Sequence, residues 1–234
     1  FGSVDIINEN IAALNTSNLR QKFSADDHLI ICIGRTHGSA GTDIGFALAD
    51  KLKINYYDAE IFNQVLKRLD AEKEGITDQG NYLEEMKGKF EKDTGAGRFF
   101  KDFKKYHGLP VQDAIFFNQS DLICDMAKHE DFIVMGRCAD VVLTNHRIPH
   151  ISIFITASFD QRVRRMMELN GLNYKQAEHL LKKLDKRHER YYHAYTGKKW
   201  GDAVNYDLCI NSASYGIEES VELIERMINK YPNS

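Results

Sequence analysis

Short apolar runs separated by longer amphipathic stretches dominate the hydrophobic pattern of this chain. The runs are rich in β-branched residues and are typical of buried strands. They occupy residues 29–33, a short segment near 54–56, 132–135, 151–155 and 207–210. Between the runs, apolar residues recur every three or four positions, which is the spacing of one helical face. This spacing predicts helices over residues 43–52, 112–128 and 217–231 and a basic helix that begins near Ser158.

Apolar strands that alternate with helices are typical of a parallel sheet covered on both faces. We therefore predict an α/β fold. In such sheets, ligands bind at the carboxyl ends of the strands. Four polar residues follow four of the expected strands, namely Thr36, Asp58, Arg137 and Thr156. The pattern predicts that these residues share one edge of the sheet.

The first expected strand leads directly into a run of small residues, Gly34 to Thr42, and then into a helix. Small residues let backbone N–H groups surround anionic oxygens, and a helix N-terminus adds a favourable dipole, so this layout predicts a phosphate site. The usual pattern G-x-x-x-x-G-K-[ST] is not matched. With Thr42 at the hydroxyl position, Gly41 stands in place of the lysine and Ala40 in place of the last glycine. A tight packing turn without a ligand is the alternative interpretation.

Four segments, taken in order, resemble the cytidylate kinase-like family, a branch of the P-loop nucleoside monophosphate kinases. They are residues 34–45, 56–58, 132–140 and 191–202, and a tail over residues 206–212 also fits. The resemblance implies a three-layer P-loop kinase fold over residues 29–234, preceded by an N-terminal extension, residues 1–28. It also implies a helical acceptor-binding insertion at about residues 59–128 and a lid at about residues 182–202.

The same resemblance implies ATP and Mg²⁺ as cofactors. The expected nucleotide-binding residues are Arg35, His37, Gly38, Ser39, Ala40, Gly41 and Thr42. Backbone N–H groups of the loop would hold the phosphates, and the Thr42 hydroxyl would bind Mg²⁺. Arg35 is the nearest replacement for the missing lysine, and His37 is a further phosphate donor. A surface arginine and an exposed histidine without a role are the alternatives.

On the acceptor side, the resemblance implies roles for Asp58, Arg137 and Asp140. Asp58 can equally be the N-cap of a following helix. An arginine directly after a buried strand and a glycine suits a phosphate better than a core. In ordinary cytidylate kinases an aspartate that helps to read cytosine follows this arginine. Cys138 stands there in this chain and Asp140 comes two residues later, which leaves the acceptor base open.

The basic segment over residues 182–190 is similar to the lid of these kinases, whose cations close over the phosphates. Lys186, Arg187 and Arg190 are its expected catalytic residues, and Asp185 and His188 its expected substrate-binding residues, with His188 at a position where the family has arginine. A solvated basic helix is the alternative. The arginines at 162, 164 and 165 are weaker candidates, because three on one helix cannot all face a site. The aromatic residues that follow, Tyr191, Tyr192, Tyr195 and Trp200, are expected to pack the lid on the body.

Composition narrows the remaining possibilities. The 234 residues are 43% hydrophobic and carry a net charge of −3, so we expect nucleotide substrates as partners, with no general affinity for nucleic acid or membranes. Cys32 and Cys209 fall in expected buried strands, and no cysteine has disulfide or metal spacing, which favours a cytoplasmic setting. No apolar run reaches transmembrane length, and no secretory signal is visible. An amphipathic helix is possible over residues 6–19.

The leading interpretation is an ATP-dependent kinase of a nucleoside monophosphate, with CMP or dCMP as the first acceptor. A kinase of another small molecule is one alternative, favoured by Cys138 and His188. A nucleotide-binding regulatory module with little catalysis is the other, favoured by the missing lysine.

Overall fold

The computed structural model describes residues 19–58, 111–136 and 138–229. Its strands are β1 (Ile30–Arg35), β2 (Asn55–Asp58), β3 (Phe132–Met135), β4 (Ile151–Thr156) and β5 (Leu208–Asn211). Its helices are α2 (Gly41–Leu52), α6 (Val111–Met126), α7 (Ala139–Asn145), α8 (Phe159–Asn170), α9 (Tyr174–Thr196) and α10 (Ser212–Asn229), with 3-10 turns at η1 (Leu19–Lys22) and η3 (Ala203–Asn205). The expected helix over residues 6–19 and most of the expected insertion lie outside the described residues.

The five strands form one parallel sheet in the order β2-β3-β1-β4-β5. β1 is the central strand, and β2 and β5 are the edges. The predicted α/β fold with a parallel sheet is therefore confirmed. Because all the strands run the same way, their carboxyl ends lie along one edge of the sheet, where Arg35, Asp58 and Thr156 end their strands.

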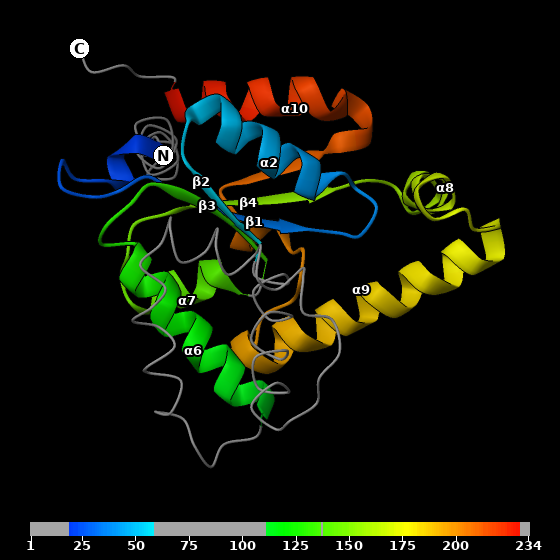
Figure 1. Ribbon diagram of the computed structural model, residues 1–234, viewed down its shortest axis with the longest axis horizontal. Helices are drawn as coiled ribbons and strands as arrows, with labels where there is room; N and C mark the ends of the chain where they lie inside the picture. The colour runs from blue at the N-terminus through cyan, green and yellow to red at the C-terminus, as the bar shows by residue number, and fades with distance from the viewer. Residues whose placement is uncertain (1–18, 59–110, 137, 230–234) are drawn as a thin grey trace, which may run out of the picture.

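Helices cover both faces of the sheet (Figure 1). Ile31 and Ile33 of β1 point to the face covered by α2 and α10, where they join a core with Ile44 and Ile224. The alternate residue Cys32 points to the opposite face, covered by α6 and α7. This alternation follows from the two-residue period of a strand. It confirms the three-layer arrangement.

The long helix α9 begins at a capping box formed by Asn173 and Gln176 and ends at Gly197, which has a left-handed backbone. It packs on α8 through residues that include Val163 and Leu181. Figure 1 shows α9 running from α8 towards the α6 and α7 side of the sheet. One helix therefore connects two distant parts of the domain.

Two details differ from the sequence-based expectations. Cys209 was expected to be buried, and this is wrong, because it lies on the edge strand β5 and its residue is exposed. The last helix begins at Ser212, before the expected residue 217, and bends at Gly216, whose backbone is not helical. No helix in the described part of the chain is long and apolar enough to cross a membrane.

Candidate functional site

The loop between β1 and α2 has the backbone of a phosphate-binding turn. Gly38 has a φ of 76° and Ala40 a φ of 58°, so both are left-handed. Ala40 thus adopts, without being glycine, a conformation that glycine adopts most easily. It is the N-cap of α2, and the first N–H groups of that helix have no acceptor within the helix. These groups are available to an anion, and the helix dipole favours one.

Two buried serines hold this loop against the ends of the neighbouring strands. The Ser39 hydroxyl lies 2.8 Å from the carbonyl oxygen of Thr36 and 3.2 Å from that of Ile155. The Ser212 hydroxyl lies 2.6 Å from the carbonyl oxygen of Ser39 and 3.0 Å from that of Thr156. The loop is therefore held from below by β4 and by the start of α10, which preorganises it.

Helix α8 closes one side of the loop. A Cβ atom on Gly38 would lie 2.9 Å from the backbone oxygen of Arg162, so only glycine fits there. The Arg162 guanidinium donates to the carbonyl of His37 at 3.2 Å and to the Asp185 carboxylate at 2.7 Å. Loop, α8 and α9 are thus joined through one side chain, which is 9% exposed.

Arg162 is the functional residue that sequence reasoning ranked too low. Its signal lay in the helical spacing: Arg162 falls three residues after Phe159 and four before Met166, on the face that packs against α9. Arg164 and Arg165 fall outside that face and pair with Asp160 and Asp43 at the surface. Asp185, expected to bind substrate, is instead engaged with Arg162 in this structure.

A second contact brings α9 onto the loop. The rings of His37 and His188 stack with centroids 4.6 Å apart and planes 19° from parallel. His188 also lies beside Trp200, at 5.7 Å between centroids. Asp185, His188 and Tyr192 are three and four residues apart, so they share the face of α9 that meets the body.

The three expected catalytic residues of α9 lie elsewhere. Lys186, Arg187 and Arg190 are all exposed, and the Arg190 side chain donates to the backbone oxygen of Lys186 at 3.3 Å. They do not line the cavity described below. Their role in closing over phosphates remains a prediction.

Arg35 lies across the carboxyl ends of three strands. It ends β1, its Nη1 approaches Gly136 after β3, and its Nη2 lies 3.5 Å from the Asp58 carboxylate at the end of β2. The two side chains are 11% and 7% exposed. Thr36 and Thr156 also meet, with their hydroxyls 3.2 Å apart. Three of the four expected edge positions therefore contribute to this edge, and Arg137 lies outside the described residues.

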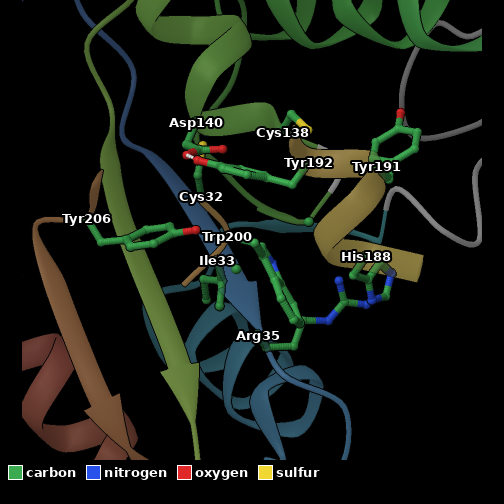
Figure 2. Close-up of a pocket in the computed structure, with 12 residues that line it drawn as sticks. Cys32, Ile33, Arg35, Cys138, Asp140, His188, Tyr191, Tyr192, Trp200 and Tyr206 are labelled. Carbon is green, nitrogen blue, oxygen red and sulfur yellow. Dashed lines mark hydrogen bonds between the residues drawn. The ribbon is translucent and has the colours of Figure 1, made fainter. Parts of the chain in front are cut away.

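A cavity of about 40 Å³ opens beside Arg35, between β1, the start of α7 and the end of α9 (Figure 2). It has room for a few water molecules. Its lining includes Arg35, Gly136, Cys138, Asp140, His188, Tyr191, Tyr192, Trp200 and Tyr206.

Asp140 is a buried carboxylate in the wall of this cavity. It accepts a hydrogen bond from the Tyr192 hydroxyl at 3.1 Å. Burial raises the pKa of Asp140, and it also raises the pKa values of Tyr192 and Tyr206, whose hydroxyls are hydrogen-bonded to each other. Burial thus favours the neutral form of all three groups.

Aromatic residues pack this end of α9 on the body, as expected. Tyr195 stacks on Phe116 of α6 with ring centroids 4.2 Å apart. Tyr191, Trp200 and Phe116 surround a small core of Cys138, Val141 and Tyr192. The cavity therefore has a rigid aromatic wall.

The donors present fit a magnesium ion that is bound mainly by phosphate. Thr42 is exposed in the first turn of α2, while the neighbouring Asp43 is paired with Arg165 at 3.0 Å. Within the described residues, no group of three or more His, Cys, Asp and Glu is placed to hold a metal. Mg²⁺ commonly keeps several waters and needs few protein ligands when phosphates supply the rest. A single threonine hydroxyl is compatible with that mode.

A sequence model of the cytidylate kinase-like family matches residues 30–214, which include the loop, the cavity and α9. The chain belongs to this family.

Members and neighbours of known name are distant. A cytidylate kinase from Staphylothermus marinus is 22% identical over 143 residues, which cover 58% of this chain and 81% of that protein. The crystal structure of an uncharacterized protein from Eubacterium ventriosum is 26% identical, with a TM-score of 0.63, and the alignment covers 87% of this chain and all of that one. A shikimate kinase from Bacteroides thetaiotaomicron is 14% identical, with a TM-score of 0.47, over 86% of this chain and 98% of that one.

Proposed function

We propose that this protein catalyses ATP-dependent phosphoryl transfer to a nucleoside monophosphate, with CMP or dCMP as the first acceptor to test. The observation that carries the proposal is the preorganised loop, in which Ala40 keeps a left-handed backbone and two serine hydroxyls hold the turn open at the start of α2. Family membership adds a kinase-like context, and the matched cytidylate kinase suggests the acceptor.

Phosphoryl transfer requires alignment, charge neutralisation and exclusion of water more than covalent help from the protein. The N–H groups at the start of α2 would bind the ATP phosphates, and the Thr42 hydroxyl would hold Mg²⁺, which neutralises phosphate charge. The contacts of α9 with the loop, through Asp185 and His188, would exclude water on one side. Asp58 and Arg137 remain proposed acceptor residues.

A kinase of a different small molecule is the second candidate. It is favoured by the wall of the cavity, where Cys138 stands in place of the expected aspartate and Asp140 is already engaged with Tyr192. Burial raises the pKa of Asp140, so the group is a poorer charged partner for a cytosine amine than an exposed aspartate.

The test is ADP formation from ATP and Mg²⁺ with CMP, dCMP, UMP, AMP and GMP, and without an acceptor. We expect turnover that depends on CMP or dCMP and falls about a hundredfold in Thr42→Val, which removes one hydroxyl from an exposed position. Thr144→Val is the matched control on α7 and should keep full activity.

Turnover only with a non-nucleotide acceptor would replace the CMP proposal with the second candidate. Binding of ATP without turnover on any acceptor would favour a regulatory module. Equal ADP formation with and without an acceptor would contradict the transfer proposal.

A further inference from the structure

Two substitutions in the phosphate loop are complementary. The pattern G-x-x-x-x-G-K-[ST] has a glycine at its first position and a lysine just before the hydroxyl residue. With Thr42 at the hydroxyl position, the first position is Arg35 and the lysine position is Gly41. The glycine and the cation have therefore exchanged places within one loop.

The two exchanged positions touch in the structure. A Cβ atom added to Gly41 would lie 2.5 Å from Cβ of Arg35 and 2.9 Å from its Cγ. The Cβ atom of Arg35 is fixed by the backbone of β1, so it cannot move aside as the tip of a flexible side chain can. A lysine at position 41 is therefore incompatible with an arginine at position 35, and the space that its stem would need is filled by the arginine stem.

A second glycine makes room for the guanidinium. A Cβ atom on Gly136 would lie 2.5 Å from Nη1 of Arg35, and Gly136 has a φ of 71°. Nη2 lies 3.5 Å from the Asp58 carboxylate. Glycines at 41 and 136 thus line the path of one arginine across the ends of β1 and β3. This is a built position for a cation, 11% exposed, rather than a surface arginine.

We propose that Arg35 supplies the charge of the missing loop lysine and binds the terminal phosphates of MgATP. The inference rests on the proposed function, since it names the cation of that same site. A guanidinium has five N–H donors in a planar fork, so one edge can remain on Asp58 while another binds phosphate oxygens. In Figure 2 the Arg35 side chain extends towards His188 of α9, and both residues line the cavity. This position suits the phosphoryl group that passes to the acceptor.

The test exchanges the two residues back. Three variants are compared with the unaltered protein: Arg35→Gly, Gly41→Lys, and the double variant that carries both. Arg164→Ala is the matched control, because it removes an exposed arginine from α8. MgATP binding is measured by calorimetry and ADP formation by a coupled assay. Thermal unfolding of each variant, together with Arg35→Lys, which keeps a charge on the stem, separates a loss of charge from a loss of fold.

We expect Arg35→Gly to weaken MgATP binding about tenfold and to lower turnover about a hundredfold, as for loss of one preorganised donor. Gly41→Lys alone should also lose activity, because its stem collides with Arg35. The double variant should recover at least about tenfold over Arg35→Gly, and this non-additivity is the signature of exchange.

Two results overturn the inference by itself: MgATP binding and turnover unchanged in Arg35→Gly, or a double variant no more active than Arg35→Gly while all variants fold. Failure of the unaltered protein to bind MgATP would overturn the proposed function, and the inference with it. If the unaltered protein binds MgATP without turnover, the binding data alone decide the inference.

Discussion

The guanidinium of Arg162 lies 2.7 Å from the carboxylate of Asp185 and 3.2 Å from the backbone oxygen of His37. One arginine thereby connects α8, α9 and the phosphate loop. Since the pair is largely buried, its charges depend on each other more than those of a surface pair do.

Removal of one partner should therefore be costly. We expect Asp185→Ala to lower the free energy of unfolding by about 3 kcal/mol, because it leaves the buried guanidinium of Arg162 without its counter-charge. Chemical denaturation measures this. The control is Asp160→Ala, which breaks an exposed pair with Arg164 and should cost less than about 0.5 kcal/mol. Equal effects of the two substitutions would show that the Arg162–Asp185 contact does not connect these elements.

The left-handed backbone of Ala40 gives a prediction of opposite sign. Ala40→Gly should raise the free energy of unfolding by about 1 kcal/mol, because glycine adopts a φ of 58° without the clash that an alanine Cβ makes. Ala47→Gly, within helix α2, is the matched control and should lower it by about 1 kcal/mol. The same sign at both positions in denaturation experiments would contradict the loop geometry.

Asp140 predicts a dependence of stability on pH. Burial raises the pKa of its carboxyl above the ordinary 3.8, so the folded state binds the proton more tightly than the unfolded state. The free energy of unfolding contributed by this group therefore falls as the pH rises from about 3.8 through the raised native pKa. In Asp140→Asn, which can still accept from Tyr192, this fall should be smaller. Parallel stability curves for the two proteins over that range would contradict the burial of a titrating Asp140.

The cysteines predict a pattern of labelling. Cys32 and Cys138 are buried, and burial raises the pKa of the Cys32 thiol well above its usual range. Cys209 is exposed on the edge strand. A thiol reagent applied to the native protein should modify Cys209 first and should reach Cys32 and Cys138 only on unfolding. Peptide mapping after timed labelling checks this, and early modification of Cys32 would contradict the packing of β1.

The strands were predictable because buried parallel strands are short, continuous apolar runs, and β1, β3 and β4 have this pattern. Their order in the sheet followed only from the family resemblance. Cys209 was misjudged because a short apolar run does not distinguish an edge strand from a central one.

The site was less predictable, because its contacts join residues that are far apart in sequence. Small residues and Thr42 identified the loop, but nothing in the sequence pairs Arg162 with Asp185 or stacks His37 on His188. The contact of Arg35 with Gly41 also depends on how the loop folds back over β1. Helical spacing on α8 was the one overlooked signal, since it separates Arg162 from Arg164 and Arg165.

The central claim is that the loop between β1 and α2 binds nucleotide phosphates, and titration of the unaltered protein with MgATP in a calorimeter tests it most directly. The account predicts binding of one MgATP per chain, with an affinity that falls as ionic strength rises, because the contacts are largely electrostatic. An absence of binding at millimolar MgATP, in a protein shown to be folded, would contradict it.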